Sequence, residues 1–245
     1  MCSIQYFKLC PYIFMMKTYL IIFFLALSTM AYSQSNGDYL YSIGVRGYSY
    51  MQMPKIMNQT TGNNYLNSNF SSFILKFNDK LFSYRLNGSY MNKDINFLNN
   101  CENCESVSGK MKDYSFKIGF EKNFTYSRVQ PYFALDLGYR SNKFEGTSIN
   151  INPILGSQDN MIPANQVIAT KEGFTITPVL GIKISPIKEI SIFVESNMEF
   201  FYSYERQESV PQDVTNVRSL NKFHKTEYLL NPVSIGIQFH IGNKN

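Results

Sequence analysis

The chain has 245 residues, of which 44% are hydrophobic, 16% are aromatic and only 17% are charged. So few charges and so many rings exclude an intrinsically disordered chain. The formal net charge of +5 is mild and its basic residues are scattered, so we expect no nucleic-acid partner. No run approaches the roughly 18 apolar residues of a spanning helix, which excludes a helical membrane bundle.

The N-terminus has the features of a secretory signal peptide. Lys17 precedes an apolar stretch over residues 19–27, and Ala31-Tyr32-Ser33 forms a cleavage signal. We therefore predict a signal peptide over residues 1–33 and a mature domain over residues 34–245. Residues 1–15 are either an extension upstream of a true start at Met16 or a longer basic region. No cysteine lies at the cleavage site, so we expect no lipid anchor.

Period-two alternation recurs along the mature chain, and this is the pattern of β-strands. It predicts eight strands, at Tyr39–Met51, Phe70–Phe77, Leu81–Asn92, Lys112–Phe124, Gln130–Lys143, Gly173–Ser185, Ile190–Tyr204 and Tyr228–Ile241. Most reach the roughly 9–11 residues that a tilted strand needs to cross a bilayer.

The two faces of these strands differ in chemistry. In the segment from Gly173 to Ser185, Phe174 and Ile176 share a large apolar face, whereas Thr175 and Gly181 share a face of small residues. Small residues with isolated charges suit a narrow closed interior, and aromatic residues near strand ends are typical of membrane interfaces. A soluble sandwich or lipocalin-like barrel, with its apolar face inward, is the open alternative.

The predicted connections alternate in length. Three are tight: Asp79-Lys80, Thr125–Arg128 and Ile187–Glu189. Four are long and polar: Gln52–Asn69, Lys93–Met111, Phe144–Glu172 and Glu205–Glu227. This alternation predicts an all-β fold, an eight-stranded antiparallel up-and-down transmembrane β-barrel with both termini on the short-turn side. Pro178 and Pro232 fall within strands, and we expect a β-bulge at each.

With this pattern, the chain resembles the small eight-stranded outer-membrane barrels of the OmpA/OmpX-like and PorT-like families. It is most similar to the outer membrane protein beta-barrel domain proteins of Bacteroidota, from Tyr39 to Ile241. The resemblance implies the outer membrane of a Gram-negative bacterium, with outer-membrane lipid and the barrel-assembly machinery as partners. Such barrels often end on an aromatic residue, whereas here Phe239 is followed by Ile-Gly-Asn-Lys-Asn.

Charged side chains fall on the inward face by parity. They are Arg46, Lys76, Arg85, Lys117, Glu121, Asp136, Arg140, Lys183, Glu195 and Glu199. An eight-stranded barrel has room only for side chains, and unpaired buried charges are costly. We therefore predict an ion network that plugs the lumen, with an ion or proton path as the alternative. A four-residue turn at Thr125–Arg128 places Lys117 opposite Asp136, and the next hairpin places Lys183 opposite Phe193 and diagonal to Glu195.

Other candidate sites lie outside this network. Cys101 and Cys104 are expected to form a small loop disulfide, and we predict no metal site and no cofactor. His224 at the extracellular end has Ser203 and Glu205 across its hairpin, where a nucleophile, base and acid could meet. His240 is expected to be a hydrogen-bonded interior histidine.

The long loops are the third candidate, because loops on a rigid scaffold commonly carry binding function. Two of them contain apolar residues that we expect to be exposed and available to an unidentified extracellular ligand or protein. In the loop Phe144–Glu172 these residues are Ile151, Ile154, Leu155, Ile162 and Val167. A solvated surface without a specific ligand is the alternative.

The sequence thus favours a non-enzymatic integral outer-membrane barrel with a structural or surface-interaction role. A small-solute channel is the first alternative. A PorT-like secretion accessory, a lipid A-modifying enzyme and a soluble lipocalin-like binding protein are the others.

Overall fold

A computed structural model describes residues 39–60, 65–79, 81–100, 105–125, 127–151, 164–212 and 217–243. The predicted signal peptide lies outside these residues. Within them the chain forms eight strands: β1 (Tyr39–Gln52), β2 (Tyr65–Asp79), β3 (Phe82–Asn99), β4 (Glu105–Asn123), β5 (Val129–Asn150), β6 (Asn165–Ile187), β7 (Ile190–Pro211) and β8 (Ser219–Asn243).

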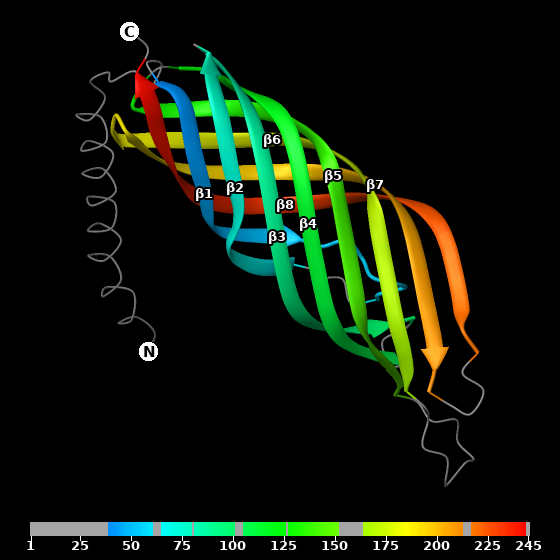
Figure 1. Cartoon of the computed structure of the whole chain (residues 1–245). Helices are drawn as coiled ribbons and strands as arrows, with labels where there is room; N and C mark the ends of the chain where they lie inside the picture. The colour runs from blue at the N-terminus through cyan, green and yellow to red at the C-terminus, as the bar shows by residue number, and fades with distance from the viewer. Residues whose placement is uncertain are drawn as a thin grey trace, which may run out of the picture.

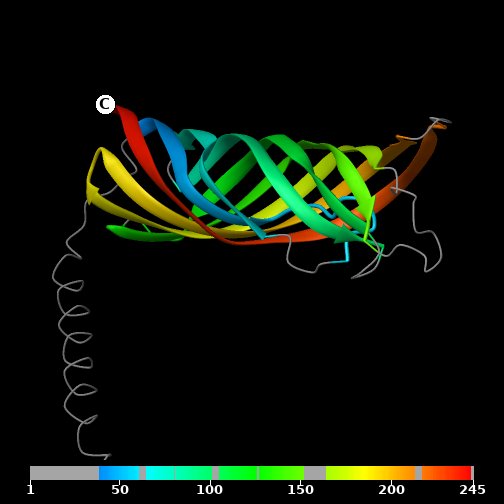
Figure 2. The same cartoon turned by 90° about the horizontal axis from the view of Figure 1, so that it is seen from below.

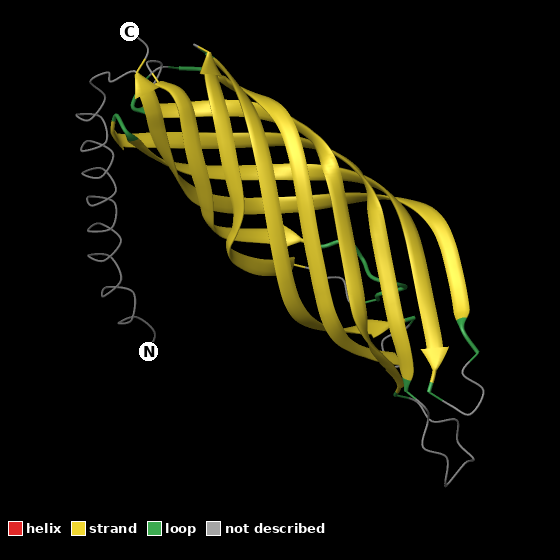
Figure 3. Ribbon diagram, viewed as in Figure 1, coloured by secondary structure: helices red, strands yellow, loops and turns green. Residues whose placement is uncertain are grey.

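The strands form one closed antiparallel barrel (Figure 1). Each strand pairs with the next in sequence, and β8 pairs with β1 to close the ring. The described part consists of strands and their connections, coloured yellow and green in Figure 3. Among the described residues there is no helix with the length and apolar character needed to cross a membrane. The predicted eight-stranded up-and-down topology is therefore confirmed.

Over the segments predicted as strands, the apolar faces point outward. Leu180 and Ile118 on the outer face are 64% and 54% exposed, whereas Lys76 and Arg85 on the inner face are each 1% exposed. A lipocalin-like barrel has the opposite arrangement, with apolar residues inside. The structure therefore excludes the soluble lipocalin-like alternative for this fold.

The predicted long loops are too long, because the strands continue into them. Of the segment Phe144–Glu172, for example, β5 includes the residues up to Asn150 and β6 those from Asn165 onward. Alternation does persist in these segments, but with the opposite chemistry. Phe144 and Val167 point inward and are buried, whereas Lys143 and Glu145 point outward.

The ring is complete only over part of its length. Pairing of β1 with β8 ends at Tyr50 and Val233, and pairing of β2 with β3 ends at Ser72 and Ser89. Beyond these points β3 to β8 continue together. We call the fully paired part the lower barrel and the six-stranded continuation the upper trough. In Figure 1 the lower barrel lies at the upper left and the upper trough extends toward the lower right. Figures 1 and 2 both show β5 to β8 extending past the end of the β1–β2 pair.

The two strand prolines behave differently. Pro232 lies in a bulge, because β8 places Pro232 and Val233 opposite the single residue Ser196 of β7. Beside this bulge, the Gln52 side-chain oxygen accepts a hydrogen bond from the Leu230 amide at 2.9 Å. This bond links β1 to β8 beyond their last backbone pair. Pro178 produces no shift of register on either side, so the predicted bulge at that position is wrong.

Candidate functional site

The lower barrel encloses a connected ion network. Arg85 lies at its centre, within 3.2 Å of Glu121, 3.2 Å of Asp136 and 3.1 Å of Glu195. Lys76 and Lys183 each lie 2.6 Å from Glu121, and Arg46 lies 2.8 Å from Glu195. The Tyr132 hydroxyl donates to Glu195 at 2.9 Å. We call these charged side chains the lower network.

Small inward residues make room for this network. The ring of Tyr132 lies against Gly181, and a Cβ atom on that glycine would overlap the ring. Phe193 occupies the space over Gly236 in the same way. The Lys76 ammonium lies 5.3 Å from the Tyr132 ring centroid, which is a favourable cation–π distance. Close packing of rings and charges therefore fills the lower lumen.

The predicted pair of Lys117 and Asp136 is wrong. Lys117 pairs with Gly138, and Asp136 lies opposite Gly119, a shift of two residues. The connection is longer than the four residues expected, because the Phe124 amide donates to the Pro131 carbonyl at 3.0 Å. By contrast, Lys183 does lie opposite Phe193, but its ammonium binds Glu121 instead of the diagonal Glu195.

A second group of charges lies above the lower network. Lys117 binds Glu199, and Arg140 bridges Glu199 at 2.6 Å and Asp113 at 2.9 Å. We call these four residues the middle cluster. A cavity of about 70 Å³ is lined by the four residues of the middle cluster and by Arg46 of the lower network. The cavity has room for several water molecules.

A third group lies in the upper trough. The Lys171 ammonium lies 3.1 Å from Glu205 and 2.8 Å from Glu227. Counting the three groups together, seven cations form ion pairs with seven carboxylates in which no side chain is more than 12% exposed. The charges of these buried ion pairs are therefore balanced in number, as burial in a medium of low dielectric constant demands.

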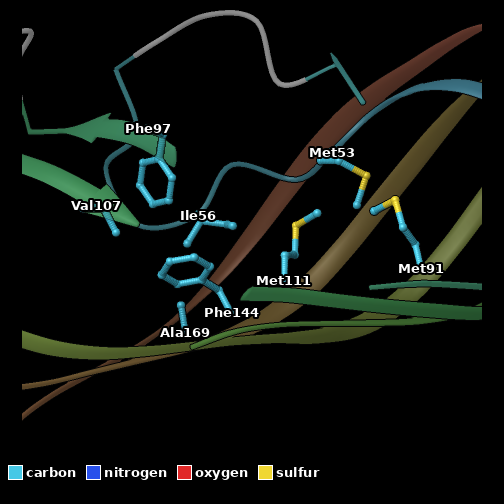
Figure 4. Close-up of a cluster of buried hydrophobic side chains, with 8 residues drawn as sticks. All are labelled: Met53, Ile56, Met91, Phe97, Val107, Met111, Phe144 and Ala169. Atoms are coloured by element: carbon cyan, nitrogen blue, oxygen red, sulfur yellow. The ribbon is translucent and has the colours of Figure 1, made fainter. Parts of the chain in front are cut away.

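The upper trough contains an apolar plug, which sequence reasoning missed. The segment that follows β1 turns inward, and its Met53 and Ile56 are only 3% and 2% exposed (Figure 4). They pack on inward side chains from β3 to β6. The complete cluster is Met53, Ile56, Met91, Phe97, Val107, Met111, Phe144 and Ala169. Methionine fills irregular space well, which suits a segment packed against a curved sheet.

Hydrogen bonds attach the plug to both borders of the trough. Toward β3, the Thr60 amide donates to the Leu98 carbonyl at 3.0 Å, and the Asn58 amide donates to the Asn99 side chain at 3.0 Å. Toward β8, the Lys55 amide donates to Glu227 at 3.0 Å. The segment from Met53 to Thr60 therefore bridges the space that β1 and β2 leave open.

Each of the two histidines contacts other side chains of the barrel. His240 lies inside the lower end of the barrel, with its ring nitrogens 2.8 Å from the Ser42 hydroxyl and 2.6 Å from the Ser191 hydroxyl. His224 lies on the outer face, where its ring stacks on Tyr202 with centroids 5.7 Å apart.

The candidate catalytic arrangement at His224 is not formed. Ser203 and Glu205 point into the lumen and are fully buried, whereas His224 points away from it. Glu205 is already bound by Lys171. The prediction was wrong because it placed Glu205 and His224 in a loop, where their side chains could turn toward Ser203, whereas both lie in strands. In a strand, residues that alternate in parity point to opposite faces.

Some predicted sites lie outside the described residues. These are Cys101 and Cys104, together with the loop residues Ile154, Leu155 and Ile162. Ile151 is exposed as expected, but Val167 is 1% exposed inside the trough. Among the described residues, no group of three or more His, Cys, Asp or Glu side chains could hold a metal ion.

All ten charged residues predicted to face inward do lie inside the barrel. Among the described residues, four further buried charges were missed: Asp113, Lys171, Glu205 and Glu227. Asp113 has the same parity as Lys117 and could have been found by extending the predicted strand by a few residues. The other three lie in segments that were interpreted as loops, so no parity was assigned to them.

No family model matches the sequence, and no curated protein matches it. Three crystal structures of outer-membrane proteins are similar in fold. A major outer membrane protein from Thermus thermophilus is 9% identical (TM-score 0.47; 82% of this chain and 99% of that chain covered). OprG from Pseudomonas aeruginosa is 11% identical (0.47; 85% and 100%). Ail, the attachment invasion locus protein of Yersinia pestis, is 12% identical (0.38; 83% and 99%).

Proposed function

We propose that the protein is a non-enzymatic integral protein of the outer membrane of a Gram-negative bacterium. The upper trough lies outside the cell, the lumen is closed, and the role is structural or one of surface interaction. Outer-membrane lipid and the barrel-assembly machinery are its expected partners. The observation that carries the proposal is the belt of exposed apolar side chains around a closed barrel.

This belt has the composition of a lipid-facing surface. Phe116, Ile118 and Phe120 of β4 are 57%, 54% and 41% exposed on the outside. A soluble protein rarely exposes such a continuous apolar surface, and a closed barrel leaves no unpaired strand edge in lipid. Aromatic residues end the belt on the side of the upper trough, as at membrane interfaces. They include Tyr48, Tyr90, Tyr114, Tyr139, Tyr204 and Tyr228.

The belt ends where the ring ceases to be complete. On β3 the last outward aromatic residue is Tyr90, adjacent to Ser89, at which pairing with β2 stops. Unpaired backbone groups therefore begin at the membrane boundary, where water can satisfy them. The agreement between these two boundaries supports a membrane position limited to the lower barrel.

The closed lumen supports a non-conducting role over the channel alternative. An ion crossing the barrel would have to displace Arg85 from three carboxylates and also pass the apolar plug. Breaking buried ion pairs is costly because each partner would be left without its counter-charge. We expect no conductance above background when the purified protein is added to a planar bilayer.

Gel mobility tests the proposed function directly. The mature protein is taken from isolated outer membranes and run with and without boiling. A folded barrel resists detergent until heated, so we expect the boiled sample to migrate differently. Recovery in the periplasm with no change on boiling would refute the proposal.

For the enzyme alternative, His224→Ala is expected to leave the lipid A profile of the cell unchanged.

A further inference from the structure

A row of cations crosses the outer face of five adjacent strands. Lys112 of β4 pairs with Lys143 of β5, which pairs with Thr170 of β6. Thr170 pairs with Arg206 of β7, and Arg206 pairs with Lys222 of β8. The four cations are exposed, and no acidic residue interrupts them. We call these five residues the basic row.

The basic row lies next to the border of the apolar belt. The next outward row toward the belt contains Tyr114, Ser141, Glu172, Tyr204 and His224. The row after that is almost wholly apolar and contains Phe116, Tyr139, Phe174, Tyr202 and Thr226. If the belt lies in lipid, the basic row lies at the level of the lipid head groups, within reach of long flexible side chains.

The side of the basic row away from the belt has a different charge. The next outward row there contains Lys110, Glu145, Ile168, Glu208 and Leu220. Glu145 binds Lys143 at 2.5 Å and Glu208 lies 3.4 Å from Arg206. Glu145 and Glu208, which bind these cations, therefore lie on their solvent side. On the membrane side the adjacent row contains one carboxylate, Glu172, at the strand without a cation in the basic row, so the four cations face no acidic partner there.

Two contacts in the basic row are unfavourable in the protein alone. Lys112 directly opposes Lys143, and Arg206 directly opposes Lys222. Like charges at directly opposed positions of a sheet destabilise it. Within the part of the chain that the structure describes, Lys112 and Lys222 form no ion pair of their own. An anion shared between opposed cations would relieve both contacts.

We propose that the basic row binds the phosphate groups of outer-leaflet lipid. A phosphate offers several acceptor oxygens to Lys and Arg, and basic clusters next to a membrane surface bind anionic head groups. The position beside the belt favours a phosphate anchored in the membrane over one free in solution. This inference rests on the proposed outer-membrane location.

Native mass spectrometry of the folded mature protein in a neutral detergent tests the proposal, with bisphosphorylated lipid A as the probe. The test variant combines Lys112→Gln, Lys143→Gln, Arg206→Gln and Lys222→Gln. The control variant combines Lys110→Gln, Lys122→Gln, Lys188→Gln and Arg218→Gln, which removes the same charge from exposed positions off the row. We expect the test variant to bind the lipid about tenfold more weakly and the control to bind like the unmodified protein.

Two further arms identify the source of the phosphate. Dephosphorylated lipid A is expected to bind the unmodified protein as weakly as the test variant binds lipid A. Inorganic phosphate at the same concentration is expected not to displace the lipid. Equal binding by both variants, or displacement by inorganic phosphate, would overturn the inference.

A folding control separates this inference from the proposed function. Each protein is first checked for the mobility change on boiling. If the test variant fails that check, the pair Lys112→Gln and Lys143→Gln replaces it. Loss of the mobility change in the unmodified protein would refute the barrel in the membrane, whereas unchanged lipid binding by a folded variant refutes only the phosphate site.

Discussion

The lower barrel and the upper trough have opposite faces. In the lower barrel, β4 directs Ile118 outward and Glu121 inward. In the upper trough the same strand directs Lys110 outward and Met111 inward, with Met111 fully buried. The strand continues without a break in register between them. One strand thus exchanges its apolar and polar faces within a few residues.

The proposed membrane position explains this difference. In that position lipid surrounds the lower barrel, where apolar residues face outward and the lumen holds paired charges. Where water surrounds the strands, the outside is polar and the inside is packed as in a soluble protein. The exchange occurs at the aromatic ends of the belt, which therefore mark the proposed membrane boundary.

Removing the centre of the lower network is expected to have the largest effect on stability. Arg85→Met leaves three buried carboxylates without their shared cation, and we expect a loss of about 3–5 kcal/mol. Since the chain contains no tryptophan, the unfolding free energy is measured by far-ultraviolet circular dichroism of vesicle-refolded protein in urea. Lys143→Met, in an exposed ion pair, is the control and is expected to change stability by less than about 1 kcal/mol. Equal effects would disprove the central role of Arg85.

Truncating the plug is expected to have the next largest effect. Ile56→Ala removes a side chain that is 2% exposed, at a cost of about 3 kcal/mol. The matched change Ile118→Ala lies on the outer belt, where lipid tails replace lost contacts, and should cost much less. The same urea titration measures both variants. An equal cost would show that the upper trough is not packed as a soluble core.

Introducing a charge at different positions of β4 tests where the proposed membrane boundary lies. Ile118→Lys places an ammonium in the belt, with an expected loss of about 2 kcal/mol. Ser108→Lys places it on the exposed outer face of the upper trough, where the loss should be close to zero. Stability in vesicles of the two variants is compared. If Ser108→Lys is as destabilising as Ile118→Lys, the boundary is misplaced.

Removing the plug alone is expected to leave the permeability of the barrel unchanged, which is the smallest of the expected effects. Replacing residues 53–60 by a Gly/Ser segment of equal length leaves the lower network intact. We therefore expect conductance in a planar bilayer to stay at background. A marked increase would mean that the plug, and not the lower network, closes the lumen.

Sequence reasoning predicted the lower barrel well, because one rule of alternation applies there throughout. The apolar outward and charged inward residues of β6 and β7 were assigned to the correct faces by parity alone. The exact partners were harder to predict, since a difference of two residues at Phe124 moves Lys117 from Asp136 to Glu199. Turn length depends on hydrogen bonds that the sequence does not reveal.

The upper trough was not predicted, although its alternation is present in the sequence. Val107, Gly109 and Met111 alternate with Ser106, Ser108 and Lys110, as in a half-buried soluble strand. The prediction required apolar residues to face outward, so this pattern was interpreted as loop. Met53 and Ile56 could not have been placed by periodicity, because their segment belongs to no strand.

Spin labelling tests most directly whether β4 exchanges its apolar and polar faces. Single cysteines replace Ile118, Lys110 and Met111 in a background without native cysteines, and each carries a nitroxide in reconstituted vesicles. We expect the label at residue 118 to be accessible to oxygen from the lipid, and that at 110 to a water-soluble nickel chelate. The label at 111 should be shielded from both. Accessibility of residue 118 to the nickel chelate would contradict the claim.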